Sequence, residues 1–127
     1  MRKNISTNTP SEKRVGYSRA VVINNRMYVT GTTSVDENGK TRGKSLREQA
    51  DYCFEKILKA LKEGGFQKED VVLVRVYVTD MKQLAGFDES FRTYFFDVKP
   101  CCTLVGISNL VSPELLIEIE CIAEKEV

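Results

Sequence analysis

The residues best suited to chemistry lie near the end of the chain. Leu115–Ala123 alternates for nine residues, which is typical of a strand with one buried face. One side would hold Leu115, Ile117, Ile119, Cys121 and Ala123, and the other Leu116, Glu118, Glu120 and Ile122. The two carboxylates would sit roughly 7 Å apart and repel each other, so they need water, a cation or a chemical role. A solvated strand face is the simplest interpretation, but Leu116 and Ile122 indicate a face partly covered, for example by another subunit.

The chain has four cysteines but no histidine, and the absence of histidine limits the chemistry that the cysteines can carry out. Without histidine there is no Ser-His or Cys-His catalytic pair, and a zinc site would need Cys and carboxylate ligands alone. We therefore expect no metal and no cofactor. Cys53 falls on a helical apolar stripe and is expected in the core. Cys102 is either a nucleophile or a small residue at the end of a loop.

A second candidate charge lies on the predicted strand Val71–Val78. Its face of Val72, Val74, Val76 and Val78 is suited to covering by helices, and its other face carries Leu73, Arg75 and Tyr77. Arg75 is expected to pair with Glu118 or Glu120 if the strands lie close, on a face packed against another subunit. The alternative is an arginine stem that carries its charge out to solvent.

These residues need a scaffold, and the first part of it is predicted by local signals. Residues 1–15 are polar and are expected to be irregular. Two strands, 20–23 and 26–31, are joined by Asn24-Asn25, which suits a two-residue hairpin turn. A capping box opens a helix at Ser45, and Gly64-Gly65 ends it. The buried stripe of that helix would be Leu46, Ala50, Cys53, Phe54, Ile57, Leu58 and Leu61.

The second part of the scaffold begins at Asp80, which can cap a helix running to about Phe96. Its buried stripe would be Leu84, Phe87, Phe91 and Phe95. Pro100 blocks further helix and directs Lys99 towards extended geometry, and a strand over 103–107 follows. The order strand-strand-helix-strand-helix-strand-strand predicts an α+β sandwich with one sheet and both helices packed on one face.

Length and charge narrow the function. A chain of 127 residues fits a single domain over 1–127. A net charge of +1 provides no general attraction to nucleic acid or to an anionic membrane, and no apolar run is long enough to span one. The N-terminus lacks the apolar stretch of a secretory signal, so we expect reduced thiols in the cytoplasm.

Several segments together resemble the Rid (YjgF) family. They are Gly16-Tyr17, Val29-Thr30-Gly31, Val76–Met81, Pro-x-x-Thr at 100–103 and Ile-Glu-Ile-Glu-x-Ile-Ala at 117–123. The resemblance runs from about Tyr17 to Ala123. It implies a chorismate-mutase-like α+β protomer, a homotrimer with clefts between subunits, and hydrolysis of reactive enamines and imines to 2-keto acids and ammonia.

The resemblance also implies roles for individual residues. In that family a tyrosine closes the cleft, an arginine holds the substrate carboxylate, and a glutamate on the last strand positions the attacking water. The tyrosine matches Tyr17, the small strand-end residues match Thr30 and Gly31, and the glutamate matches Glu118. An asparagine of the second helix falls on Asp88, and the arginine falls on Cys102. Thr103, which follows it, and Arg75 are further candidates for substrate binding.

The change at Cys102 determines the functional expectation. A neutral thiol has no fork of donors, so carboxylate binding would weaken by about a thousandfold. Either Arg19 or Arg75 supplies a displaced cation, or the substrate lacks a carboxylate. We expect hydrolysis of a small imine, enamine or related electrophile with Glu118 orienting water, but poor turnover of 2-aminoacrylate and 2-iminobutyrate.

Two other functions are alternatives. The first is a trimer that binds a small metabolite without catalysis. The second is RNA cleavage or translation inhibition, an activity name attached to part of the family. The sequence argues against RNA as a partner because it has no basic patch with interleaved aromatic residues.

Overall fold

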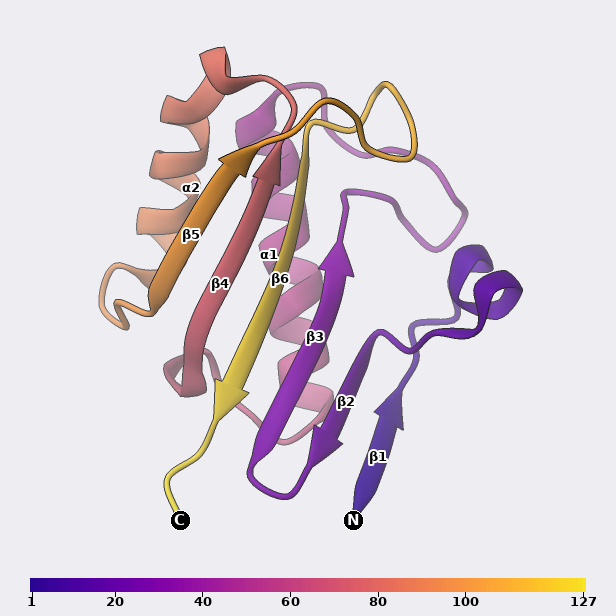
Figure 1. The fold of residues 1–127 in the computed structure, drawn as a ribbon, viewed down its shortest axis with the longest axis vertical. Coiled ribbons are helices and arrows are strands. Elements are labelled where there is room, and N and C mark those ends of the chain that lie inside the picture. Colours follow the sequence, from indigo (N-terminus) through magenta and orange to yellow (C-terminus); the bar gives the residue numbers. More distant parts are fainter.

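A computed structural model describes all 127 residues (Figure 1). The strands are β1 (Arg2–Ile5), β2 (Ala20–Ile23), β3 (Arg26–Thr32), β4 (Val71–Val78), β5 (Cys101–Gly106) and β6 (Ile117–Glu124). The helices are α1 (Leu46–Glu63) and α2 (Leu84–Phe95). Short helical turns occupy Glu12–Gly16, Lys68–Asp70 and Met81–Gln83.

The six strands form one mixed sheet in the order β1-β2-β3-β6-β4-β5. Neighbouring strands are antiparallel except β4 and β5, which are parallel. Both long helices lie behind the same face of the sheet, and the opposite face is left uncovered in the protomer (Figure 1). The predicted α+β fold, with one sheet and both helices on one side, is confirmed.

The core lies between the sheet and the helices. The side of β6 that was predicted to be buried is no more than 3% exposed along its whole length. Phe54 of α1 packs against the aromatic stripe of α2, with ring centroids 5.2 to 6.3 Å apart. Burying each such side chain contributes about 1.5–3 kcal/mol, so this layer fixes the helices against the strands that carry the site.

Local backbone signals act as predicted at the ends of α1. The Ser45 hydroxyl accepts a hydrogen bond from the Glu48 amide at 3.1 Å, and the Glu48 carboxylate accepts one from the Ser45 amide at 3.0 Å. After the helix, Gly65 takes φ +81°, which a residue with a Cβ rarely adopts. The hairpin turn places Asn24 at φ 54°, a conformation that asparagine tolerates.

The N-terminal segment was predicted wrongly. Arg2–Ile5 is not irregular but pairs antiparallel with β2, with Ile5 opposite Ala20. Ile5 is buried, yet a single apolar residue among polar ones gives no period-two signal. This edge strand is stabilised by backbone hydrogen bonds and by one anchor, neither of which a local pattern reveals.

Two details of the central and edge strands also differ. Val72 is 44% exposed rather than buried, because the register shifts between Val71 and Leu73 and a bulge turns the side chain outward. Lys99 takes φ 55° rather than extended geometry. Its amide bonds the Phe95 carbonyl at 2.9 Å, so the left-handed turn that ends α2 outweighs the preference imposed by Pro100.

Asp80 caps the short helical turn that precedes α2, rather than α2 itself as predicted. Its side chain accepts from the Lys82 amide at 3.1 Å and caps the turn Met81–Gln83, after which α2 begins at Leu84.

Neither α1 nor α2 combines the length and the apolar composition needed to cross a membrane.

Candidate functional site

Glu118 lies where two cavities meet. The larger, about 790 Å³, is lined by Tyr17, Arg19, Gly31, Lys56 and Glu118 together with parts of the loops around 33–41 and 111–115; we call it the Glu118 cleft. The smaller, about 500 Å³, lies on the uncovered face of the sheet and is also lined by Gly31 and Glu118. The Glu118 carboxylate is therefore reachable from both sides of the β3 end.

Gly31 makes room for this carboxylate. The pairing of β3 with β6 shifts between Val29 and Thr32, and this irregularity brings the Gly31 backbone close to Glu118. A Cβ at Gly31 would contact the Glu118 carboxylate oxygen and lie 2.9 Å from its Cδ. Only glycine fits here without moving the acid.

Glu118 is a carboxylate without a hydrogen-bond partner in the protein. Burial raises the pKa of its carboxyl above the ordinary value, the neighbouring charge of Glu120 raises it further, and Arg19 partly opposes this. Such a group accepts a proton more readily than a surface glutamate does. In a cleft, these are the properties of a candidate general base.

Glu120, two residues along the same strand, has different surroundings. It accepts a hydrogen bond from the Tyr77 hydroxyl at 2.7 Å and pairs with Arg75 at 3.5 Å. The predicted pairing of Arg75 with an acid is thus seen, and the acid is Glu120. The Arg75 side chain is 47% exposed and does not line the Glu118 cleft.

Arg19 lines the cleft, but its charge is already neutralised. The side chain is 4% exposed and forms an ion pair with Glu12 at 3.4 Å. It also donates to the Gly31 carbonyl at 3.3 Å and to the Thr32 hydroxyl at 3.1 Å. Burial raises the pKa of Glu12, but hydrogen bonds from Thr7, Thr9 and Ser6 outweigh it and lower that pKa to about 2. The pair therefore stays charged and supports the end of β3.

Tyr17 stands at the mouth of the cleft. Its side chain is 38% exposed, and its hydroxyl shares a hydrogen bond with Ser11 at 2.7 Å. Thr30, by contrast, does not line the cleft; its amide bonds the Arg19 carbonyl at 3.0 Å. Of the candidate residues, the fold brings Tyr17, Gly31 and Glu118 together in one cavity.

The other candidates lie elsewhere on the protomer. On β5, Cys102 is opposite Val74, whose side chain faces the helices, whereas Thr103 is opposite Arg75. Partial burial raises the pKa of the Cys102 thiol, and the charge of Asp88 adds to this, which places Asp88 near the thiol. None of Asp88, Cys102 and Thr103 lines the Glu118 cleft. A thiol with a raised pKa is protonated near neutral pH and is a weak nucleophile.

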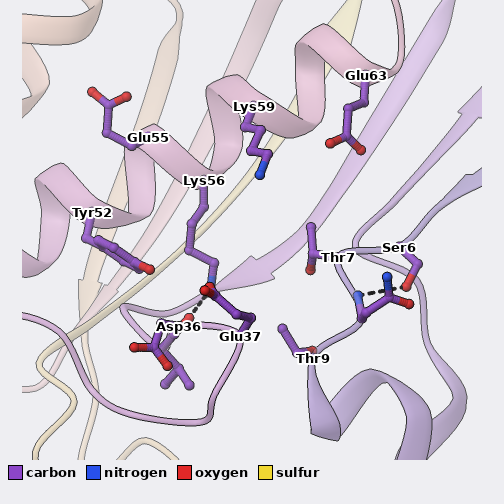
Figure 2. A pocket seen from close by; sticks show the side chains of 12 residues that line it. Ser6, Thr7, Thr9, Asp36, Glu37, Tyr52, Glu55, Lys56, Lys59 and Glu63 are labelled. Carbon is purple, nitrogen blue, oxygen red and sulfur yellow. Dashed lines mark hydrogen bonds between the residues drawn. The ribbon is translucent and has the colours of Figure 1, made fainter.

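Lys56 is a cleft residue that the sequence analysis does not identify. Its ammonium donates to the carbonyls of Thr33 at 2.9 Å and Val35 at 2.8 Å. On its other side lies a third cavity, about 520 Å³, into which Lys56 and Lys59 extend from α1 (Figure 2). One signal was available: Lys56 stands three residues after Cys53 and four before Ala60, on the edge of the buried stripe.

Comparison with known proteins gives a consistent result. The model of the endoribonuclease L-PSP family matches residues 7–125. A RutC family protein of Pyrococcus abyssi is 34% identical over 128 residues, covering 99% of this chain and 100% of the relative. The mitochondrial protein MMF1 of Saccharomyces cerevisiae is 30% identical, covering 87% of this chain and 80% of the relative.

Solved structures agree with this. A member of the YjgF/YER057c/UK114 family from Mycobacterium tuberculosis superposes with a TM-score of 0.91 at 33% identity, covering 98% of this chain and 100% of that one. The YjgF gene product of E. coli superposes with a TM-score of 0.85 at 24% identity, covering 98% of this chain and 99% of that one, a likeness of fold. The chain therefore belongs to the endoribonuclease L-PSP family, the family of the YjgF and RutC proteins.

Proposed function

We propose that this protein hydrolyses a small imine, enamine or related electrophile in a cleft shared between the subunits of a homotrimer. The observation that carries the proposal is the state of Glu118: a half-buried carboxylate with no protein partner and a raised pKa, facing a cavity beside Gly31. It is suited to holding a water molecule and accepting its proton.

The reaction consumes one water and releases one ammonia. The water oxygen bonds to the carbon of the C=N group while its proton passes to Glu118. Glu118 returns that proton to the nitrogen, which gives a neutral carbinolamine. The hydroxyl proton then passes to the nitrogen, the C–N bond breaks, ammonia leaves and the C=O bond of the product forms. An enamine enters the same sequence after protonation at carbon converts it to the imine. No cofactor is needed for these steps.

The division of the site supports its assembly from two subunits. Tyr17, Gly31 and Glu118 line one cleft, whereas Cys102 and Asp88 lie together near β5 and α2 of the same protomer. The uncovered sheet face exposes large side chains, including Tyr28 and Val105 at 42% and 44%. A second protomer covering this face would bury them, and Cys102 lies on β5, the edge strand of the sheet, where a neighbouring subunit can reach it from the side.

We do not expect the protein to bind 2-aminoacrylate or 2-iminobutyrate efficiently. Cys102 offers no positive charge, and the nearby Asp88 adds a negative one, so an anionic carboxylate is poorly held on this side. Loss of that contact also supports the alternative of a trimer that binds a metabolite without turning it over. Cleavage of RNA is less well supported, because the net charge is +1 and no histidine is present.

The deciding experiment restores the missing charge. Cys102→Arg should increase ammonia release from dehydratase-generated 2-iminobutyrate by at least tenfold, with semicarbazide trapping measuring the imine that escapes hydrolysis. Cys102→Gln is the matched control because it lengthens the same side chain without adding a positive charge, and it should change little. Equal turnover by wild type and both variants would refute the proposed role of position 102.

Glu118→Gln tests the catalytic step itself. It should abolish ammonia release while leaving the sedimentation coefficient unchanged, because Glu118 lies beside the cleft and makes no hydrogen bond in the protein. Unchanged turnover would remove Glu118 from the mechanism.

We further propose a cytoplasmic location, supported by four free cysteines, of which Cys101 and Cys102 are exposed, since such thiols persist in a reducing compartment.

A further inference from the structure

Lys56 is a cleft cation that is partly buried and has no acidic partner. Its nitrogen bonds only the carbonyls of Thr33 and Val35, and Figure 2 shows its side chain reaching from α1 towards the loop that holds Asp36. The two arginines first considered as a displaced anchor are both paired, Arg19 with Glu12 and Arg75 with Glu120. Two carbonyls take two of the three N–H groups of Lys56, so one N–H and the full charge remain available.

Lys56 and Glu118 line the same cleft from two different elements. Cys53 precedes Lys56 by about one helical turn, and its thiol contacts the Thr32 carbonyl at 3.3 Å. Burial raises the pKa of that thiol to about 12, while the charge of Lys56 lowers it and the charge of Glu118 raises it. Both charges, one from α1 and one from β6, therefore act on the pKa of this buried thiol, and both residues line the cleft.

The lysine is placed where its charge is poorly hydrated. Burial, and then the nearby Arg19, lower the pKa of Lys56 to about 8. An ammonium whose hydration is incomplete gains more from an anion than a surface lysine does. Arg14 and Lys40 also line the cleft, but both are exposed to solvent.

We infer that Lys56 holds the carboxylate or other anionic group of the substrate in the Glu118 cleft, from α1 rather than from β5. The inference rests on the proposed function, because it concerns the same cleft, and it assigns the substrate to the class of small anionic carbonyl or imine compounds. A single ammonium provides a point charge without the fork of an arginine, so the anion is held more weakly and at a different angle. This agrees with poor turnover of 2-aminoacrylate.

The titratable groups around Lys56 come from every neighbouring element. They are Glu12 and Arg19 from the N-terminal segment, Asp36 and Glu37 from the loop after β3, Tyr52, Cys53, Glu55, Lys59 and Glu63 of α1, Glu114 before β6, and Glu118 of β6. Glu12, with a pKa of about 2, and Cys53, with a pKa of about 12, keep their charge states between pH 7 and 9.5. Lys56 loses its charge within that interval.

The test measures binding rather than turnover, with 2-oxobutyrate as a stable anionic probe titrated into the full-length protein by calorimetry. At pH 7, Lys56→Gln should weaken binding at least tenfold. Lys59→Gln is the matched control, because Lys59 lies one turn along α1 and lines only the cavity of Figure 2. It should bind as the wild type does. Equal affinity in Lys56→Gln and wild type, with both folded by thermal unfolding, would overturn the inference.

The pH dependence provides a second measurement that does not need Lys56→Gln to fold. Wild-type affinity should fall as the pH rises from 7 to 9.5, because Lys56 deprotonates. Lys56→Arg keeps its charge over that range and should bind at pH 9.5 as well as at pH 7. A wild-type affinity that stays constant, or one that falls equally in Lys56→Arg, contradicts the assignment.

The two proposals fail separately. Lys56-dependent binding of 2-oxobutyrate with no ammonia release from any imine would refute the hydrolysis and keep the anion site. Hydrolysis that depends on Glu118 but binding that ignores Lys56 would do the reverse. Glu118→Gln should retain 2-oxobutyrate binding, since removing a negative charge from the cleft does not disfavour an anion.

Discussion

Glu118 and Glu120 are identical side chains two residues apart on β6, yet the fold gives them different properties. Glu120 is satisfied by Tyr77 and Arg75 on the sheet face. Glu118 projects to the end of β3, where no donor meets it and where burial raises the pKa of its carboxyl. A charge kept at a site that disfavours it reduces stability, so it is a sign of function rather than of folding.

The raised pKa of Glu118 predicts that the variant Glu118→Gln is more stable than wild type, by an amount that depends on pH. In the folded protein Glu118 binds its proton above the ordinary value of 4.5, so wild-type stability falls as pH rises from about 4.5 through the raised pKa. The variant Glu118→Gln has no carboxyl group to deprotonate at this position, so its stability does not fall in this way. Its melting temperature should exceed that of wild type at pH 7, and the difference should vanish near pH 4. Thermal unfolding at both pH values measures it, and a variant less stable than wild type at pH 7 would contradict the prediction.

A second prediction concerns the room that Gly31 leaves. The Cβ of Gly31→Ala would overlap the Glu118 carboxylate, and the end of that flexible side chain would swing aside, which changes stability little but moves the acid. We expect ammonia release to fall at least tenfold. Gly106→Ala is the control, because its Cβ would meet the flexible Met81 side chain at 3.2 Å. Equal activity in the two variants would show that Glu118 tolerates displacement.

At the scale of single residues, the sequence predicts the direction of the Glu118 side chain but not the groups that surround the cleft. Alternation along β6 determines that Glu118 points away from the core, because side chains of a strand alternate. The roles of Lys56 and Glu12 depend on where the loops around 33–35 and 6–12 lie after folding. No local pattern contains that information, so the sequence does not reveal Lys56 as a cleft cation or Arg19 as a paired one.

At the scale of elements, α1 does more than cover the sheet. Gln49, Cys53 and Lys56 lie on one side of it and bond backbone groups of the loops around the cleft. Gln49 is fully buried; its amide donates to the carbonyls of Gly43 at 3.1 Å and Glu114 at 2.9 Å. Its oxygen accepts from the Leu116 amide at 2.8 Å, which fixes the segment leading into β6.

Gln49→Leu should therefore destabilise the protein and loosen the cleft together. Three part-buried hydrogen bonds would be lost, each contributing about 0.5–1.5 kcal/mol, so we expect the free energy of unfolding to fall by about 3 kcal/mol. Urea denaturation measures this. Ser45→Ala removes the cap of the same helix, should cost about 1 kcal/mol, and should leave 2-oxobutyrate binding unchanged. A loss in Gln49→Leu no larger than in Ser45→Ala would refute the structural role of Gln49.

At the scale of the whole molecule, the order and type of the long elements follow from local periodicity and caps, and the layer arrangement follows from their order. What could not be predicted depends on pairing between distant segments. The strand β1 exists because the edge of β2 is available to it, and the bulge at Val72 exists because β4 must match β6. Both are properties of the assembled sheet, and neither is encoded in a window of a few residues.

Within one protomer Glu118 lines the cleft and Cys102 does not, and this leads to a prediction about the oligomer. If each active cleft takes Glu118 from one subunit and position 102 from the next, two inactive variants can complement each other. Glu118→Gln should be inactive for lack of a base, and Cys102→Trp should be inactive because the indole fills the cleft from the neighbouring subunit. Each variant alone should sediment as a trimer.

Co-refolding the two variants in equal amounts should restore activity to about a quarter of the wild-type level. Random assembly gives a Cys102→Trp subunit donating Glu118 beside a Glu118→Gln subunit donating Cys102 in about one cleft in four. Mixing the folded variants without refolding is the control and should restore nothing while subunits do not exchange. A cleft formed within one protomer predicts no activity in the mixture, and a wild-type protein that sediments as a monomer would likewise contradict a cleft shared between subunits.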